Sequence, residues 1–202
     1  MSLVEPRLDA AQLRRALRGC TIGRDVLVLD ETTSTNDFVF NIATRETPEG
    51  IVVFAERQTA GRGQHGNRWE SAAGKGLWFS ILLRPNILAD EAPRLTSWAA
   101  QTVAETISAE LSLGTCVKPP NDVYVGDRKV AGVLLEMRAR PEEPHLGILG
   151  IGINVNHAPE DFPLSLRARA ASLAMVLGRR IDRQALAIAL LRNLGRGYAA
   201  NF

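Results

Sequence analysis

The residues best suited to chemistry begin in a glycine-rich segment at positions 61–69, which reads GRGQHGNRW. Glycine has no side chain, so the backbone amides of such a segment can approach an anion closely and form an anion-binding nest. Arg62 and Arg68 add positive charge, and the planar guanidinium group suits phosphate. The segment lacks the Gly-Lys-Ser/Thr ending of a P-loop, and no helical pattern follows it directly, as a dinucleotide fingerprint requires. Alone, the pattern fits either an anion-binding loop or a flexible surface turn.

A second cluster of polar residues reads KPPND at 118–122 and is followed by Lys129. Two prolines stiffen the approach to Asn121 and Asp122, whose amide and carboxylate oxygens can coordinate Mg²⁺. Lys129 stands at the entrance of the next apolar run and can point a positive charge into the same cavity. The alternative is an ordinary hairpin with Lys129 in solvent, because most lysines are exposed.

Two further segments place polar side chains or glycines where a ligand could use them. The run GIGINVN at 150–156 has glycines inside a strand pattern, which usually marks a close approach by backbone or ligand. Its Asn154 and Asn156 fall on one face of that strand. The run STN at 34–36 could hydrogen-bond a neutral polar ligand. The alternatives are a buried strand that ends in a turn, and a helix cap.

The strands expected to position these segments come mostly from the middle of the chain. Apolar runs predict strands at Val26–Leu29, Ile51–Ala55, Leu77–Leu83, Val123–Val125, Val130–Met137 and Leu146–Val155. Turns at Gly126-Asp127 and at 141–144 separate the last three runs. These three runs therefore predict an antiparallel meander.

Helices are expected between and after the strands. Asp9 can cap a short helix, and Ser34 begins another, with Asp37 three residues further on. Apolar residues spaced by four predict a third helix that begins near 95 and ends at 111, and a fourth runs from 182 towards 198. This arrangement predicts an α+β fold, a mixed and mainly antiparallel sheet covered by helices.

Composition limits the class of protein. The length of 202 residues, with 46% hydrophobic and 23% charged residues, fits one packed domain. A net charge of +2 is too weak to suggest nucleic-acid binding. The apolar runs are far shorter than the ~20 residues of a membrane span, and the N-terminus lacks the layout of a signal peptide. Cys20 and Cys116 stand alone, so we expect reduced thiols and a cytoplasmic location.

The motifs follow one another in an order that one protein family shares. They are STN at 34–36, QTAGRG at 58–63, WES at 69–71, KPPND at 118–122, Lys129 with Gly132, and GINVN at 152–156. The series resembles the catalytic domain of biotin–protein ligases, the biotin–[acetyl-CoA carboxylase] ligase family, from about Val28 to Asn156. Each motif alone is a weak signal, but six of them in the same order are specific to this family.

The resemblance implies a fold similar to class II aminoacyl-tRNA synthetases and a two-step ligase reaction. Biotin attacks the α-phosphate of ATP to give biotinoyl-5′-AMP, and a lysine of biotin carboxyl carrier protein then takes the biotin. The resemblance also implies Mg²⁺ as cofactor, the carrier domain of a biotin-dependent carboxylase as partner, and a homodimer, which many members form.

The resemblance further assigns roles to individual residues. The catalytic residues would be Lys129 and Arg62. The biotin site would contain Ser34, Thr35, Asn36, Gln58, Gly61, Arg62, Gly63, Trp78, Ser80, Lys129 and Gly132. The nucleotide site would contain Arg62, Gly63, Gln64, Trp69, Asn121, Asp122 and Asn154, with Asp122 and Asn154 as metal ligands.

Elementary electrostatics agrees with these roles. The biotin carboxylate and the triphosphate are both anionic, and at 4 Å and an effective dielectric near 20 one unit charge contributes roughly 4 kcal/mol. Arg62 and Lys129 could therefore offset much of the repulsion in the transition state. Neutral partners such as Gln58 suit the neutral ureido ring, because a charged residue there would be buried unpaired.

The sequence departs from the family pattern in three places. Pro119 stands where many members have tryptophan, which removes an apolar wall. Gln64 and Asn67 replace two loop arginines, so we expect weaker retention of the adenylate. Only about 33 residues precede Ser34, and the chain stops where many ligases begin a C-terminal SH3-like barrel. We therefore expect a single catalytic domain over 1–202, with no winged-helix domain and no DNA binding.

Other functions compete with this interpretation. A lipoate-type ligase or acyltransferase shares the fold and the lysine, although an apolar acyl chain needs no ureido partners such as Thr35 and Gln58. A non-catalytic protein that binds biotin or an adenylate is a second alternative. Metal-centred or Ser-His-Asp hydrolysis is a weaker third, because His65, His145 and His157 show no ligand or nucleophile spacing.

Overall fold

A seven-stranded sheet with the order β1-β2-β3-β7-β6-β5-β4 organises residues 6–138 and 145–202, which the computed structural model describes. Only β1 and β2 run parallel, and every other neighbouring pair is antiparallel. The predicted mixed, mainly antiparallel α+β fold is therefore confirmed.

The elements have the following bounds. The strands are β1 (Asp25–Thr32), β2 (Ile51–Gln58), β3 (Gly76–Leu83), β4 (Thr115–Lys118), β5 (Asp122–Val125), β6 (Arg128–Arg138) and β7 (Leu146–Asn154). The α-helices are α1 (Ala10–Ala16), α2 (Thr35–Ile42), α3 (Ala92–Leu111), α4 (Leu173–Leu177) and α5 (Arg183–Asn201). Short 3-10 turns are η1 (Gln64–Gly66), η2 (Ala89–Glu91) and η3 (Pro159–Asp161).

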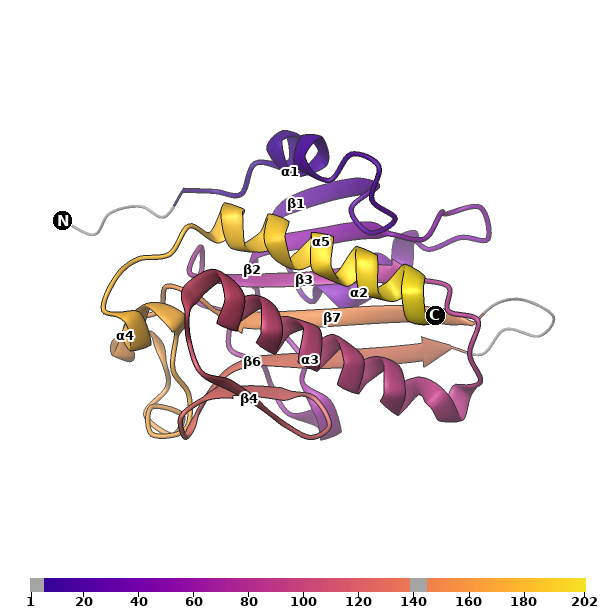
Figure 1. Cartoon of the computed structure of the whole chain (residues 1–202). Coiled ribbons are helices and arrows are strands. Elements are labelled where there is room, and N and C mark those ends of the chain that lie inside the picture. Colours follow the sequence, from indigo (N-terminus) through magenta and orange to yellow (C-terminus); the bar gives the residue numbers. More distant parts are fainter. Residues whose placement is uncertain (1–5, 139–144) are drawn as a thin grey trace.

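The two faces of the sheet are covered differently. Helices α3 and α5 lie across one face, with α1 beside the β1 edge (Figure 1). Successive side chains of a strand point to opposite faces, so Leu77, Phe79 and Ile81 of β3 enter the large core under α3 and α5. Leu82 instead enters a smaller core with Val39 of α2. The opposite face therefore carries α2 and a much smaller apolar core.

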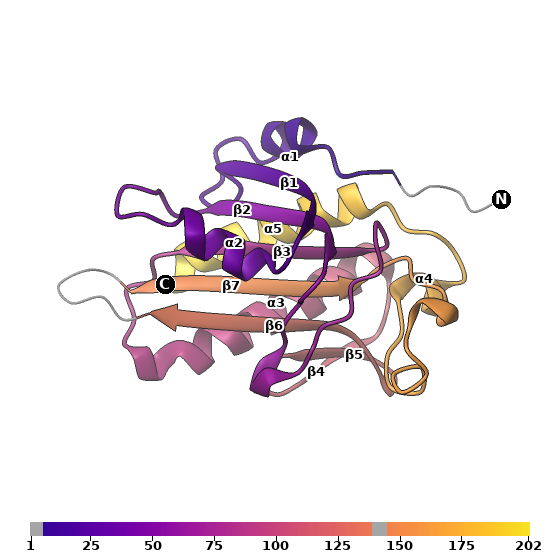
Figure 2. The same ribbon diagram turned by 180° about the vertical axis from the view of Figure 1, so that it is seen from behind.

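The face that carries α2 leaves room for a site. Helix α2 contacts β2, β3 and β7 there (Figure 2). The segment that joins β2 to β3 crosses β3, β7 and β6 on the same side, and η1 lies at the far end of its path. This segment holds the predicted glycine-rich loop, which is thus placed over the middle of the sheet.

Most element predictions are confirmed; most strands are longer than the apolar runs indicate, whereas β7 ends one residue earlier than predicted. The meander is formed by β5, β6 and β7. The turn predicted at 141–144 lies outside the described residues. Two short elements, β4 and α4, were not predicted.

No helix in the described ranges has the length and apolar character needed to cross a membrane. Cys20 and Cys116 form no disulfide.

Candidate functional site

The predicted biotin residues surround a narrow cavity on the α2 face of the sheet. We call it the inner cavity. It is lined by Ser34, Thr35, Asn36, Gln58, Arg62, Gly63, Gln64, Trp69, Phe79, Asn121, Lys129, Gly132, Val133, Leu134, Gly150, Ile151 and Gly152. These residues come from the start of α2, the end of β2, the glycine-rich loop, β3, the β4–β5 connection, β6 and β7.

Glycines in β6 and β7 allow larger side chains to lie against the sheet. Gly132 and Gly152 are cross-strand partners. A Cβ atom on Gly152 would come within 2.6 Å of the Trp69 indole, and one on Gly132 within 2.9 Å. A Cβ atom on Gly150 would come within 2.3 Å of Asn36 Oδ1. Glycine at these positions leaves the space that the side chains of Trp69 and Asn36 occupy.

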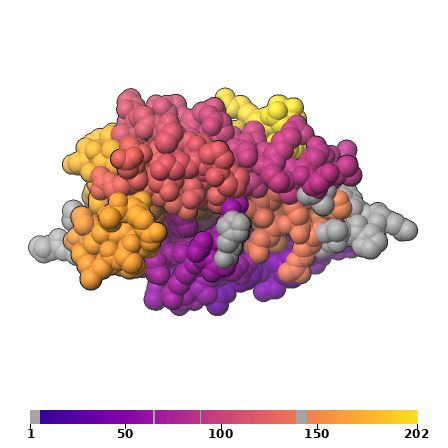
Figure 3. Space-filling model, turned by 90° about the horizontal axis from the view of Figure 1, so that it is seen from below, coloured from indigo at the N-terminus to yellow at the C-terminus, as the bar shows by residue number. Residues whose placement is uncertain are grey.

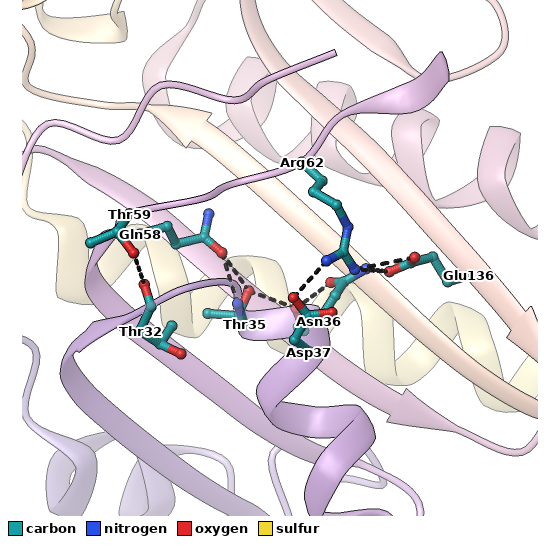
Figure 4. Close-up of polar contacts among 9 residues, drawn as sticks. Thr32, Thr35, Asn36, Asp37, Gln58, Thr59, Arg62 and Glu136 are labelled. Carbon is teal, nitrogen blue, oxygen red and sulfur yellow. Dashed lines mark hydrogen bonds and ion pairs between the residues drawn. The ribbon is translucent and has the colours of Figure 1, made fainter. Parts of the chain in front are cut away.

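A row of polar contacts runs along one wall of the inner cavity (Figure 4). Gln58 Oε1 accepts from the Thr35 amide at 2.8 Å and from the Thr35 hydroxyl at 3.1 Å. The buried Ser80 hydroxyl lies within hydrogen-bond distance of both Thr35 Oγ1 and Asn36 Oδ1. Asn36 Nδ2 then donates to Glu136 at 2.6 Å. The polar side chains are thus held in fixed orientations.

Ser34 takes the N-cap position of α2, but its side chain makes no capping hydrogen bond. It is only 2% exposed and lines the inner cavity. The capping role considered for the 34–36 segment therefore does not account for the hydroxyl, which is placed at the cavity instead.

Arg62 is bound to two carboxylates that the sequence analysis did not single out as site residues. Its guanidinium donates to Asp37 of α2 at 2.6 Å and to Glu136 of β6 at 2.9 Å (Figure 4). The hydrogen bond to Asp37 is the main cause that raises the pKa of Arg62 above its usual value. The arginine reaches the cavity, but its charge is already compensated.

Trp69 and Lys129 lie between the inner cavity and a second, wider outer cavity, which they also line. The rest of the outer wall is Asn67, Arg68, Glu70, Asp122, Tyr124, Asn154, Phe162, Leu166, Arg169 and Ala170. In the space-filling view, the loop surface lies beside the segment that follows β7 (Figure 3). Two adjoining cavities that share one lysine suit a reaction between two substrates.

Lys129 is fixed in place at the boundary between the cavities. Its Nζ lies 2.6 Å from Asp122 Oδ1 and 5.3 Å from the centre of the Trp69 ring. Its backbone bonds to Arg169 and Ala171 of the segment after β7. Because its side chain is only 29% exposed, the solvent-facing alternative does not hold.

A buried histidine packs against Trp78, which lies next to Trp69. His157 stacks on Phe162 at 5.0 Å and meets Trp78 edge-on at 5.5 Å between ring centres. Neither ring nitrogen has a hydrogen-bond partner among the described residues. Burial lowers the pKa of His157 to about 4, so the ring is neutral. Its role is packing.

The structure brings most predicted site residues together, but three do not line either cavity. Trp78 is 1% exposed and lies beneath Trp69 and His157, so it supports the wall instead of forming it. Ser80 is buried and acts through Thr35 and Asn36. Gly61 is buried against the carbonyl of Trp69.

The predicted nucleotide residues divide between the two cavities. Asp122 and Asn154 line the outer cavity, whereas Gln64 and Asn121 line the inner one. Asn121 Nδ2 donates to the Val133 carbonyl at 2.8 Å, so this side chain links the residue before β5 to β6. Their roles toward a nucleotide stay predictions.

Asp37 and Glu136 are the functional candidates that sequence reasoning missed. A sequence signal did exist for Glu136, since it is the one charged residue between Lys129 and Arg138 in an otherwise apolar strand. For Asp37 the sequence offered only a capping role, because its partner Arg62 lies 25 residues away.

Comparison with known proteins agrees with this geometry. The chain belongs to the Biotin/lipoate A/B protein ligase family, which it matches over residues 28–154. The matched segment contains both cavities except for the part of the outer wall that follows β7.

Curated relatives and a solved structure point in the same direction. The chain is 38% identical over 177 residues to the bifunctional ligase/repressor BirA of Bacillus subtilis, covering 88% of this chain and 54% of that protein. It is 34% identical over 200 residues to the biotin–[acetyl-CoA-carboxylase] ligase of Mycobacterium tuberculosis, covering 95% and 71%. The Aquifex aeolicus biotin protein ligase in complex with biotin and ATP superimposes with a TM-score of 0.76 at 31% identity, covering 86% and 70%. The chain spans about half the length of the Bacillus relative.

Proposed function

We propose that this chain is an ATP-dependent biotin–protein ligase that forms biotinoyl-5′-AMP and passes biotin to a lysine of a biotin carboxyl carrier protein. The observation that carries the proposal is the pair of adjoining cavities that share Lys129 and Trp69. The inner cavity is lined by neutral polar groups at Ser34, Thr35 and Gln58, and the outer cavity is lined by the predicted nucleotide residues Asp122 and Asn154.

The inner cavity is proposed to hold biotin. Its ureido ring would lie against Ser34, Thr35 and Gln58, which offer neutral hydrogen-bonding groups. Its carboxylate would extend toward Arg62 and Lys129, the two cations that line the cavity. A charged ring-binding residue would be buried without a partner, so neutral groups are the physically suitable choice.

The reaction would take place at the boundary between the cavities. A biotin carboxylate oxygen forms a bond to the α-phosphorus of ATP, and the bond to the pyrophosphate oxygen breaks. In the second step the neutral amine of the carrier lysine attacks the acyl carbon, AMP leaves, and the amine loses a proton. Arg62 and Lys129 would stabilise the negative charge that these steps concentrate, and Trp69 would shield the anhydride from water.

Magnesium is proposed to arrive with the nucleotide. In the described ranges no group of three or more histidine, cysteine or acidic side chains could hold an ion. Mg²⁺ in nucleotide sites usually takes most of its ligands from phosphate groups and water, and only one or two from the protein. Asp122 and Asn154 would be enough to supply those protein ligands. Asp122 would then have to exchange its bond to Lys129 for one to the ion.

A lipoate-type ligase is the second candidate, because the family includes lipoate ligases. An apolar dithiolane ring would leave the polar groups around Gln58 without partners, which costs binding free energy. We therefore favour biotin, and we place the reaction in the cytoplasm, where both free cysteines would stay reduced.

The proposal is tested by incubating the protein with ATP, Mg²⁺ and a carrier domain, with biotin or lipoate as acyl donor. Mass spectrometry should detect one added biotin on the carrier and no lipoate. Transfer of lipoate alone would favour the second candidate. Biotin binding without pyrophosphate release would indicate a non-catalytic binding protein.

A further inference from the structure

Five charged side chains line the outer cavity, and one of them has no ion-pair partner among the described residues. The five are Arg68, Glu70, Asp122, Lys129 and Arg169. Lys129 Nζ lies 2.6 Å from Asp122 Oδ1, and Arg68 Nε lies 3.3 Å from Glu70 Oε1. These two pairs are each neutral as a whole. The net positive charge of the cavity wall therefore comes from Arg169.

The guanidinium of Arg169 is available to a ligand. Its one hydrogen bond within the described ranges goes to the Ser165 carbonyl at 3.4 Å, which is longer than an ordinary N–H···O bond. The residue is exposed, so this bond can be exchanged for a bond to a ligand without leaving a buried group unpaired. Phosphate suits such a group, because the planar fork of an arginine can donate to two oxygens at once.

The backbone of Arg169 is held beside the lysine that both cavities share. The Arg169 carbonyl accepts from the Lys129 amide at 2.8 Å, and the Arg169 amide donates to the Leu166 carbonyl at 2.9 Å. The Ala171 amide in turn donates to the Lys129 carbonyl at 3.0 Å. The main chain of Arg169 is therefore fixed relative to Lys129, while its guanidinium has no carboxylate to compete with a ligand.

The proposed reaction indicates which anion would lie near this guanidinium. The α-phosphate of ATP has to meet the biotin carboxylate beside Lys129, at the boundary between the cavities. The β- and γ-phosphates carry further negative charge, of which Mg²⁺ offsets only a part, and they would extend beyond that boundary into the outer cavity. The carboxylates of Glu70 and Asp122 already compensate the other two cations there, so Arg169 is the group left to attract these phosphates.

We propose that Arg169 binds the β- and γ-phosphates of ATP and stabilises pyrophosphate as it leaves. This inference rests on the proposed function, since it takes ATP as the substrate of the outer cavity. When the bond from the α-phosphorus to the bridging oxygen breaks, the electron pair stays on that oxygen, and the pyrophosphate group gains negative charge. A guanidinium in contact with this group stabilises that charge and keeps its own protons.

Arg169→Met tests the proposal, because it removes the charge and keeps an unbranched side chain. Initial rates of biotin transfer to a carrier domain give the KM for ATP and the inhibition constants of pyrophosphate and AMP. The KM for ATP and the inhibition constant of pyrophosphate should each rise by about tenfold, since charge-assisted hydrogen bonds are the stronger kind. The Kd of biotin, measured by calorimetry, should change by less than about twofold, because Arg169 does not line the inner cavity.

AMP and salt distinguish a phosphate contact from a merely structural role. AMP has only the phosphate that would lie beside Lys129, so its inhibition constant should change by less than about twofold in Arg169→Met. The KM for ATP should rise more steeply with added KCl in the wild-type protein than in the variant, because salt screens an exposed charge contact. Arg179→Met removes the same charge from an exposed position that lines neither cavity, and it should behave as the wild type.

The outcomes separate this inference from the proposed function. Equal constants for ATP and pyrophosphate in Arg169→Met and the wild type would overturn the inference, and so would an equal loss for AMP and pyrophosphate. The proposed function stands in both cases, as long as the wild-type protein transfers biotin. Failure of the wild type to transfer biotin would overturn both. Arg169→Gln provides the same comparison if Arg169→Met does not fold.

Discussion

At the scale of single residues, the site is governed by how its charges are compensated. Lys129 is paired with Asp122, and Arg62 is paired with both Asp37 and Glu136. The arginine group therefore carries a formal charge of −1, from one cation and two carboxylates. Anionic substrates must compete with these carboxylates for the arginine. An additional positive charge near the glycine-rich loop should therefore strengthen the binding of anionic substrates.

Gln64 gives a direct test of that charge balance. It lines the inner cavity, and the resemblance to the family leads us to expect arginine at this position. Gln64→Arg adds one positive charge, and we expect biotinoyl-AMP to leave at least several-fold more slowly, because a nearby unit charge is worth up to roughly 4 kcal/mol. Release is measured as free adenylate after rapid filtration. Gln101→Arg, on the exposed side of α3, is the charge-matched control, and equal release from both variants would contradict the expectation.

His157 predicts how stability depends on pH. Its folded-state pKa is about 4, below its ordinary value of 6.5, because the ring is buried. As the pH falls below 6.5, the unfolded chain binds a proton that the folded protein refuses, so stability is lost down to about pH 4. Between pH 7 and pH 5 this effect amounts to about 2 kcal/mol. In His157→Phe, urea unfolding at the two pH values should show a smaller difference by that amount, and an unchanged difference would refute the assignment.

At the scale of elements, the start of α5 depends on a buried ion pair. Arg183 is 3% exposed, binds Glu56 at 2.8 Å and donates to the carbonyls of Gly76 and Pro6. It therefore fastens α5 to β2, β3 and the segment before α1. A buried charge without its partner is strongly destabilising, so Arg183 and Glu56 each need the other to stay buried.

Removing either residue of the Arg183–Glu56 pair should lower the free energy of unfolding substantially. Arg183→Ala leaves Glu56 buried without its cation, and we expect a loss of about 3–5 kcal/mol in the free energy of unfolding. Arg57→Ala breaks the exposed pair with Glu31 and should lose less than about 1 kcal/mol. Urea denaturation of both variants checks the contrast, and similar losses would show that Arg183 is not structurally critical.

Much of the element pattern could be predicted from the sequence, and the exceptions have physical causes. Asp9 caps α1 as predicted, because capping is decided within three residues. Ser34 begins α2 without capping it, because its hydroxyl is placed at a cavity formed by distant strands. The same difference between local features and contacts of distant segments applies to the site. The family motifs predicted part of the residues that line the two cavities, whereas the contacts of Arg62 depend on the register of β6 and could not be read from spacing.

At the scale of the whole molecule, one face of the sheet builds stability and the other builds the site. Helices α3 and α5 cover the large core, which leaves β6 and β7 free to carry glycines on the opposite side. Glycine weakens a strand, but here it creates the space that Trp69 occupies between the two cavities. The position of the Trp69 indole should therefore control how closely ligands in the two cavities can approach each other.

Gly152→Ala tests this view of Trp69. A Cβ atom would come within 2.6 Å of the indole, so the ring must move. We expect tryptophan emission to shift to longer wavelength and biotin-dependent pyrophosphate exchange to fall by about tenfold or more, because small displacements are costly in a site. Gly114→Ala is the control, since its Cβ would meet nothing within 4 Å. Normal exchange in Gly152→Ala would contradict a boundary role for Trp69.

The most direct measurement is biotin-dependent exchange of labelled pyrophosphate into ATP by a double variant, Arg62→Met with Lys129→Met. Without the two cations that line the inner cavity, the carboxylate and the triphosphate should repel each other, and exchange should fall by about a hundredfold or more. Arg15→Met with Arg18→Met removes the same charge from an exposed surface near α1 and should exchange normally. Undiminished exchange in the first variant would contradict the proposal that these cations bring the two substrates together.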